Sequence, residues 1–182
     1  MEGKQDKFIE LYEQHNEAFG RFCRARAYGI MDASDLMSET LLKAYESFEK
    51  LKNPNAFLGY LIGISKNILN SKLRRRKFKG GYTEKLANQI PSEGVSAEMR
   101  MDIQFLYQCL NELPEQQKDA IILFEISGYS VKEIAIIQNA GESAVKQRLK
   151  RGREKLGEIM KNDELRSEPI SGKSQILVSI FL

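Results

Sequence analysis

The stretch from Gly128 to Leu156, GYSVKEIAIIQNAGESAVKQRLKRGREKL, predicts two helices joined by a tight turn. Ser130 can cap the first helix, and Glu133, three residues later, completes the pattern of a capping box. Asn139-Ala140-Gly141 breaks the helical periodicity with residue types that tolerate a left-handed backbone. Apolar residues mark one face of each helix: Val131, Ile134, Ala135 and Ile137, then Val145, Leu149 and Leu156, with Gly152 where that row would continue.

The second helix of this pair is basic on its other faces, which carry Lys146, Arg148, Lys150, Arg151, Arg153 and Lys155. A short capped helix, a turn with Gly and a basic second helix form the pattern of a helix-turn-helix, which lays its second helix in a DNA major groove. Ser143, Lys146 and Gln147 are placed to read base edges, and the Arg and Lys cluster to hold phosphates. The alternative is an ordinary helix pair with a solvated basic face. The turn and the capping box favour DNA binding.

The whole chain of 182 residues is predicted to be all-α, because helix formers dominate and strand-like alternation is hard to find. Its formal net charge is only +3, but the charge is unevenly distributed. Residues 66–79 hold seven basic and no acidic groups, and residues 146–155 hold six basic and one acidic group. Phosphate binding depends on such local clusters, so the sequence predicts two separate contacts with nucleic acid.

Periodicity and capping residues predict the further helices and divide the chain. Helices are expected from Asp6 to Ala27, after Asp32-Ala33-Ser34, from Pro54 to Lys77, from Ala97 to Asn111 and from Pro114 to Gly128. Residues 80–97 are polar, begin with Gly80-Gly81 and lack periodicity, as a flexible linker does. We therefore expect two small helical domains, 1–79 and 98–162, the second with four helices, followed by a tail over 163–182.

Residues for catalysis or metal binding are hard to find. Cys23 and Cys109 are isolated, and His15 is the single histidine, so no metal-ligand spacing occurs. There is no Gly-rich phosphate loop and no nucleophile paired with a base, so we expect no enzyme, no catalytic residue, no cofactor and no small-molecule substrate. The charged N-terminus does not read as a signal peptide, and no apolar run approaches the length of a membrane span. A cytoplasmic protein is expected.

Three segments, in this order, resemble the bacterial sigma factors of the small extracytoplasmic-function class of the sigma-70 family. Residues 35–40, DLMSET, resemble D-L-x-Q-E-[TA], with Ser38 in place of Gln. Residues 57–76 resemble F-x-x-W-L…I-A-R-N…L-R-R-x, with Tyr60 in place of Trp. Residues 113–156 resemble L-P-x-x-x-R-x-x-[FL]…Y-x-E-I-A…V-K-S-R-L-x-R-A-R-x-x-L, with Lys118 in place of the first Arg. The resemblance covers most of the chain.

For the first domain, the resemblance implies binding to the core enzyme of RNA polymerase and melting of the promoter's minus-ten element. The core enzyme would be contacted by Asp35, Leu36 and Glu39. A flipped base would be held by the loop from Lys52 to Asn55. The implied minus-ten residues are Lys52, Asn53, Asn55, Tyr60, Lys66, Asn67, Asn70, Arg74, Arg75 and Arg76. Tyr60 either packs in the core or stacks on a base.

For the second domain, the resemblance implies recognition of the minus-thirty-five element. The implied residues are Lys118, Ser130, Glu142, Ser143, Lys146, Gln147, Arg148, Lys150, Arg151 and Arg153. The implied partners are the core polymerase, promoter DNA and an anti-sigma factor, and the implied function is promoter recognition and transcription initiation. A stand-alone helix-turn-helix regulator is the competing hypothesis, because the second domain alone would fit it.

Overall fold

The computed structural model describes residues 3–78 and 96–164, which form helices and contain no strand. The first domain comprises α1 (Lys4–Glu13), α2 (Asn16–Ala27), α3 (Ala33–Glu46) and α4 (Phe57–Phe78), with 3-10 turns at Phe48–Lys50 and Pro54–Ala56. The second comprises α5 (Ala97–Asn111), α6 (Glu115–Ile121), the π-helical turn η3 (Ile122–Ile126), α7 (Val131–Ile137) and α8 (Glu142–Glu164). The all-helical prediction is confirmed. Most of the predicted linker and tail lies outside the described residues.

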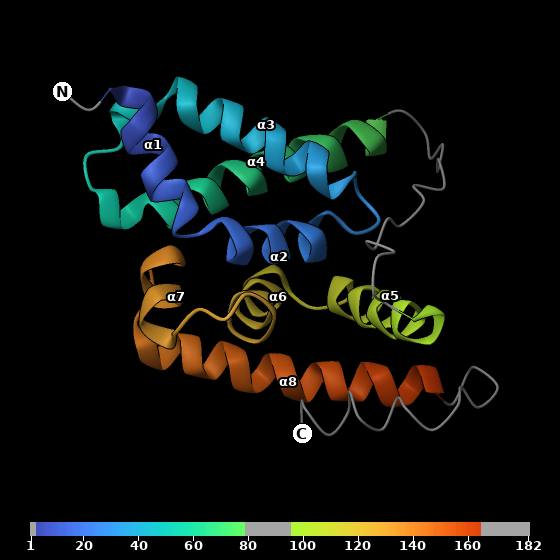
Figure 1. Cartoon of the computed structure of the whole chain (residues 1–182). Helices are drawn as coiled ribbons and strands as arrows, with labels where there is room; N and C mark the ends of the chain where they lie inside the picture. Colours follow the sequence, from blue (N-terminus) through green and yellow to red (C-terminus); the bar gives the residue numbers. More distant parts are fainter. Residues whose placement is uncertain (1–2, 79–95, 165–182) are drawn as a thin grey trace.

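The single helix predicted from Asp6 to Ala27 is wrong, because the chain breaks at Gln14 and His15 into α1 and α2. The break lets the two helices pack against different parts of the molecule. Phe8 of α1 makes edge-to-face contacts with Tyr45, Phe48 and Phe57, at centroid distances of 5.4, 5.2 and 5.4 Å. α2 instead crosses beneath α3 and reaches the second domain (Figure 1). Periodicity alone does not reveal this change of direction.

Local capping signals correctly place the other turns of the first domain. Asp32 caps α3 by accepting from the backbone N–H groups of Ser34 and Asp35. Asn53 caps the turn before α4, which begins three residues later than predicted. Gly29 follows the end of α2 and has φ +71°. Glycine adopts this left-handed conformation without strain, so it suits the point where the helix stops.

The core of the second domain is formed by α6, η3 and α7 packed on one side of α8. Ile121, Leu123, Ile134 and Leu156 are all fully buried. Gly152 is also buried, and a Cβ atom placed on it would lie 2.9 Å from Cγ1 of Ile121. The gap in the apolar row of α8 is therefore filled by α6.

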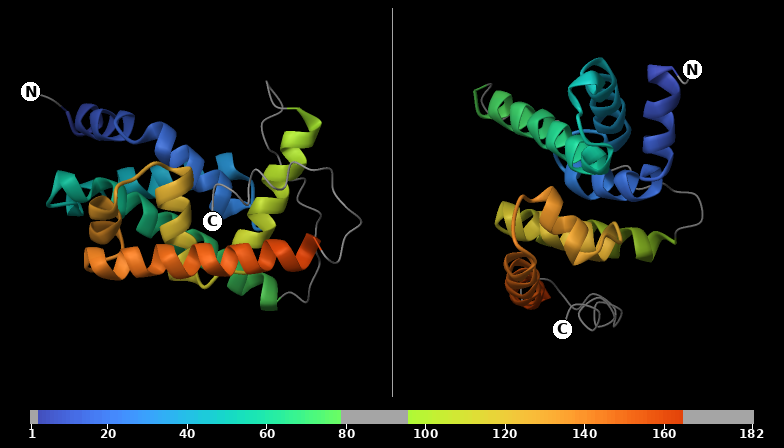
Figure 2. Two further views of the ribbon diagram at one scale, coloured as in Figure 1. Left: turned by 90° about the horizontal axis from the view of Figure 1, so that it is seen from below. Right: turned by 90° about the vertical axis from the view of Figure 1, so that its left-hand side faces the viewer.

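The two domains are stacked on one another through α2 and α4 above and α6, η3 and α7 below (Figures 1 and 2). α3 lies on the outer side of the first domain, and α8 on the outer side of the second. These two helices are therefore on opposite sides of the molecule. Within the described ranges, no helix is both long and apolar enough to span a lipid bilayer.

Candidate nucleic-acid interface

The helix-turn-helix is built as the sequence predicts, with one change in its turn. The Ser130 hydroxyl accepts from the backbone N–H of Glu133 at 3.3 Å, and the Glu133 carboxylate accepts from the backbone N–H of Ser130 at 2.8 Å. Asn139 adopts φ 46°, whereas Gly141 has no positive φ. Asn139 therefore supplies the left-handed residue of the turn, and Gly141 stands directly before α8.

Replacing Ser130 with alanine removes this cap from α7 and leaves the backbone N–H of Glu133 without its partner. We expect the second domain to lose about 1 kcal/mol of stability. Thermal unfolding followed by circular dichroism measures the effect. Ser130→Thr keeps the hydroxyl and should lose less. Equal losses from both substitutions would show that the cap does not stabilise the domain.

One side of α8 is open to solvent and holds six of the residues predicted to bind DNA. About two and a half turns of the helix present them at spacings of three and four residues, which places them together on one face. All six are exposed: Glu142, Ser143, Lys146, Gln147, Lys150 and Arg151. This set, called here the α8 face, offers amide, hydroxyl and carboxylate groups to base edges and three cations to phosphates.

Two other arginines of α8 are engaged within the second domain. Arg148 donates to the side-chain oxygen of Gln138 at 2.7 Å. Arg153 donates to Glu125 from Nε at 2.8 Å and lies over the ring of Phe124, 5.5 Å from its centroid. In this structure these arginines therefore support the position of α8 rather than extend toward DNA.

Lys118 is not available to DNA phosphates in this structure, which contradicts its predicted place in the interface. Its side chain is buried and its amine pairs with Glu115 at 3.3 Å and with Asn111 at 3.5 Å. Burial and the charge of nearby Arg26 lower the pKa of Lys118, although Glu115 partly compensates. Lys118 thus has a structural role here, tying α6 to the end of α5.

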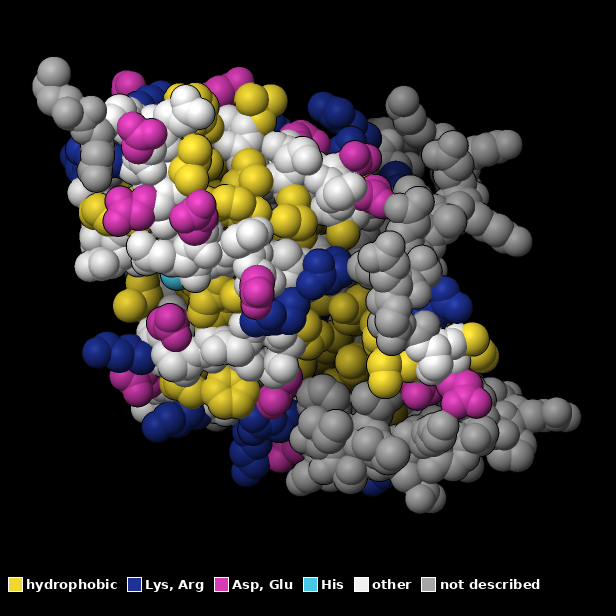
Figure 3. Space-filling view, viewed as in Figure 1, with side chains coloured by type: hydrophobic (Ala, Val, Ile, Leu, Met, Phe, Trp, Pro, Cys, Tyr) yellow, Lys and Arg dark blue, Asp and Glu magenta, His cyan; other side chains and the backbone are white. Residues whose placement is uncertain are grey.

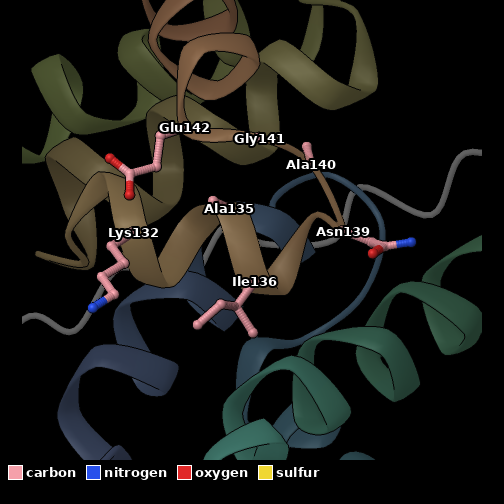
Figure 4. Close-up of a pocket in the computed structure, with 7 residues that line it drawn as sticks. All are labelled: Lys132, Ala135, Ile136, Asn139, Ala140, Gly141 and Glu142. Atoms are coloured by element: carbon pink, nitrogen blue, oxygen red, sulfur yellow. The ribbon is translucent and has the colours of Figure 1, made fainter.

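An open depression lies between α7 and the turn before α8 (Figure 4). Lys132 and Glu142 stand at one end and Asn139 at the other, with the exposed side chain of Ile136 between them. The first helix of a helix-turn-helix crosses the DNA backbone, so the exposed Lys132 is placed for a phosphate contact. Lys132 was not among the predicted DNA-binding residues. Its position just after the Ser130 cap was the available signal.

In the first domain, α3 and the C-terminal half of α4 enclose a groove of about 410 Å³. Ile64 and Ile68 give it an apolar part, and its polar lining includes Asn67, Lys43, Lys72, Arg74 and Arg75. Arg74 and Arg75 were predicted, whereas Lys43 and Lys72 were missed. Lys72 belongs to the basic run 66–79, but Lys43 comes from α3 and only the fold brings it here.

Other predicted minus-ten residues hold the first domain together. Arg76 donates to the backbone carbonyls of Gly29 and Ile30, each at 2.7 Å. The Tyr60 hydroxyl donates to the carbonyl of Ala44 at 3.0 Å and lies 2.5 Å from the Ser47 hydroxyl. The Arg76 bonds fasten α4 to the connection between α2 and α3. The Tyr60 bonds fasten α4 to the end of α3 and favour the packing role of Tyr60.

The loop before α4 keeps its polar groups near solvent. Lys52, Asn53 and Asn55 are all exposed. The side-chain oxygen of Asn53 accepts from the backbone N–H of Asn55 at 3.0 Å, so this oxygen is already used by the cap. The Asn53 amide nitrogen, Asn55 and Lys52 are the loop's remaining side-chain groups for a base.

The outer face of α3 combines carboxylates with an exposed leucine. Asp35 and Glu39 lie one turn apart, and Leu42 follows at the next turn with 60% of its surface exposed. A hydrogen bond from Lys43 lowers the pKa of Glu39, so it remains a carboxylate at neutral pH. Leu36 is fully buried. Its predicted contact with a partner is therefore incompatible with this fold, and Leu42 is the exposed leucine of the face.

Further apolar side chains extend this face along α3 and onto α1. Ile9 of α1 and Tyr45 of α3 are 42% and 36% exposed, and hydrophobic side chains gather over α1 and α3 in Figure 3. Such a patch beside carboxylates has the mixed character of a protein-binding surface.

Comparison with known proteins identifies both halves of the chain. Residues 11–79 match the family described as "Sigma-70 region 2", and residues 104–156 match "Sigma-70, region 4". RNA polymerase sigma factor CarQ of Myxococcus xanthus is 24% identical over 90% of this chain and 95% of its own length. ECF RNA polymerase sigma factor EcfG of Rhodopseudomonas palustris is 29% identical over 70% of this chain and 71% of its own.

A solved structure of the sigma factor RpoE in complex with the anti-sigma factor NepR, from Bartonella quintana, is similar to the chain, with a TM-score of 0.66 and 27% identity. The match covers 85% of this chain and 96% of the Bartonella quintana sigma factor chain. The match of residues 11–79 to region 2 disfavours a stand-alone helix-turn-helix regulator, which would leave the first domain unexplained. Because regions 2 and 4 match in order and the similar proteins are extracytoplasmic-function sigma factors, the chain belongs to the sigma-70 family, as an RNA polymerase sigma factor of that class.

Proposed function

We propose that this sigma factor divides promoter recognition between its two domains as follows. The first domain binds the core polymerase through Asp35, Glu39 and Leu42 on the outer face of α3. The observation that carries this assignment is a stripe on the outer side of α3, away from the second domain (Figure 1), in which Asp35 and Leu42 are exposed and Glu39 is partly exposed. Carboxylates of this kind attract a basic partner surface, and the leucine supplies the apolar contact.

The proposed DNA contacts lie on two separate surfaces. The groove between α3 and α4, with Arg74 and Arg75, takes the melted strand, and the loop from Lys52 to Asn55 takes a base turned out of it. The α8 face reads the minus-thirty-five element in the major groove. Domains 1–79 and 98–162 thus act as separate DNA-binding units. Catalysis belongs to the polymerase, and the factor supplies promoter choice.

An anti-sigma factor is a further proposed partner. The support is the similarity to the Bartonella quintana sigma factor, which was solved in complex with the anti-sigma factor NepR. The proposed site of action is the cytoplasm, because the protein is proposed to act there with RNA polymerase on promoter DNA.

The test is binding of the purified protein to core polymerase, measured by fluorescence anisotropy, with a double Asp35→Lys, Glu39→Lys variant beside the wild type. We expect the variant to lose at least about tenfold in affinity, because both attractive charges become repulsive. The ion pair between Glu39 and Lys43 is partly exposed and therefore weak, so Glu39 can exchange it for a contact with a partner.

A double Glu112→Lys, Glu158→Lys variant is the matched control. It changes the net charge equally, but both residues lie on the second domain and are exposed. It should bind core polymerase as the wild type does. Equal losses in both variants would mean that net charge rather than the α3 face decides binding, and a wild type that does not bind would overturn the proposed function.

A further inference from the structure

Glu39 belongs to two surfaces of the first domain. It lies one turn after Asp35 on the outer face of α3, which is proposed to bind core polymerase. It also lines the groove between α3 and α4, which is proposed to take the melted strand. Asp35 and Leu42, the other residues assigned to the polymerase contact, are not among the described residues that line this groove. Glu39 therefore joins a protein-binding surface to a nucleic-acid-binding one.

The Glu39 carboxylate stands among the cations of the groove. Its Oε1 accepts a hydrogen bond from Nζ of Lys43 at 2.7 Å. This bond lowers the pKa of Glu39, and the positive charges of Lys72 and Arg75 lower it further. The carboxylate is therefore ionised at neutral pH, and it is the one acidic side chain among the described residues that line the groove.

Other polar residues of α4 that were predicted to follow DNA are placed elsewhere. Lys66 pairs with Asp119 of α6 at 2.6 Å, and Arg76 donates to two backbone carbonyls of the connection after α2. Asn70 lines a separate depression beside the second domain. The positive charge that the groove offers to a strand is therefore mainly that of its own lysine and arginine side chains.

A carboxylate in this position opposes nucleic acid in two ways. It holds the ammonium group of Lys43, the cation that α3 contributes to the groove, and its own charge repels phosphates that approach. A phosphate that enters the groove must therefore compete with Glu39 for Lys43. Removing the carboxylate from the groove would both free one cation and end the repulsion.

The pair between Glu39 and Lys43 is suited to exchange. The two side chains are 35% and 49% exposed, and they lie one turn apart on the same helix, where such pairs are weak. A basic side chain that approaches the outer face of α3 meets Asp35 and Glu39 together. Glu39 can then turn toward it without any movement of the helix, which takes the acidic group out of the groove.

We propose that Glu39 couples the two binding events of the first domain. In the free chain its carboxylate holds Lys43 and lowers the positive potential of the groove. When core polymerase binds, a basic side chain of the polymerase takes Glu39, and Lys43 becomes free to bind a phosphate of the melted strand. Each partner therefore strengthens the binding of the other. This coupling rests on the proposed function, which assigns the outer face of α3 to polymerase and the groove to DNA.

One additional phosphate contact sets the size of the coupling. For single strands the logarithm of the binding constant falls with the logarithm of the salt concentration by about 0.7 for each contact. A contact that vanishes near about 1 M salt is then worth about fivefold in affinity at about 0.1 M salt. The freed Lys43 should therefore raise the affinity about fivefold and steepen the salt dependence by about 0.7.

The first test removes the charge of Glu39 and keeps its shape. The probe is a fluorescent oligothymidine, and its binding to the free full chain is measured by anisotropy over a range of salt. We expect Glu39→Gln to bind it about fivefold more tightly at about 0.1 M salt, with the steeper salt dependence. Glu46→Gln is the matched control, because Glu46 is exposed on the same helix and is not among the described residues that line the groove. Equal gains from both variants would overturn the coupling, because net charge alone would explain them.

The second test asks whether Glu39 acts through Lys43. In a chain that already carries Lys43→Gln, the additional change Glu39→Gln should raise the affinity for oligothymidine by no more than about twofold, since the cation to be freed is gone. A gain that stays at about fivefold would overturn the exchange. Circular dichroism melts of each variant check that the first domain remains folded.

The third test measures the same exchange from the polymerase side. Lys43→Gln leaves Glu39 without its partner, so we expect core polymerase to bind this variant about two- to fivefold more tightly than the wild type. Lys50→Gln is the control, because Lys50 is an exposed cation of the same domain outside the described lining of the groove. Equal gains from Lys43→Gln and Lys50→Gln would overturn the coupling. If the wild type does not bind core polymerase at all, the proposed function itself is wrong. If it binds, but Glu39→Gln leaves the affinity for oligothymidine unchanged, only the coupling is wrong.

Discussion

Replacing Leu36 with alanine will lower the free energy of unfolding by about 3 kcal/mol, whereas the same change at Leu42 will leave stability almost unchanged. Leu36 is fully buried among the helices of the first domain, so truncation removes its contacts and leaves a cavity. Leu42 is 60% exposed on the outer face of α3 and packs little. Chemical denaturation of the two variants measures the difference directly.

Polymerase binding should show the reverse order. Leu42→Ala removes the proposed apolar contact of the α3 face, and we expect core polymerase to bind roughly tenfold more weakly. Leu36→Ala, measured under conditions where it remains folded, should bind nearly as the wild type does. Strong loss of binding by folded Leu36→Ala together with none by Leu42→Ala would restore Leu36 to the interface and contradict the assignment made from its burial.

The two leucines show why a motif places a surface better than it places each residue on it. Asp35, Leu36 and Glu39 are close in sequence, but their side chains point in different directions because a helix turns by 100° per residue. Asp35 and Glu39 share the outer face, while the core of the first domain takes Leu36. Only the position of α2 and α4 behind α3 decides between these directions.

Local signals predicted most of the helix ends correctly. The Ser130–Glu133 capping box, the Asp32 cap and the turn at Gly29 each depend on a few neighbouring residues, so they are readable without tertiary structure. The charged residues of the interdomain contact, in contrast, could not be predicted from neighbouring residues. Arg26 and Asp119 are far apart in the chain, and each lies in a stretch that resembles an ordinary exposed polar face. Their burial depends on the stacking of two domains, which no local pattern encodes.

Replacing Gly152 with valine will destabilise the second domain by about 3 kcal/mol, and alanine by about 1 kcal/mol, although alanine is the better helix former by about 1 kcal/mol. An added Cβ would lie 2.9 Å from Cγ1 and 3.3 Å from Cδ1 of Ile121. Ile121 is fully buried, so its side chain has little room to move, and overpacking outweighs the gain in helix propensity. Denaturant unfolding measures both variants.

The family pattern that this chain resembles has alanine at the position of Gly152 and phenylalanine or leucine at the position of Ile121. A β-branched isoleucine in a helix strongly prefers one rotamer and cannot turn Cγ1 away, whereas leucine has a single Cγ and more freedom. We infer that Gly152 compensates for Ile121. A double-mutant cycle tests this coupling: Gly152→Ala should cost at least about 1 kcal/mol less when Ile121→Leu is present. Additive effects would show that a contact other than the one with Ile121 requires glycine at position 152. The next residue to vary would then be Gln117, because its Cβ lies 3.5 Å from the added Cβ atom.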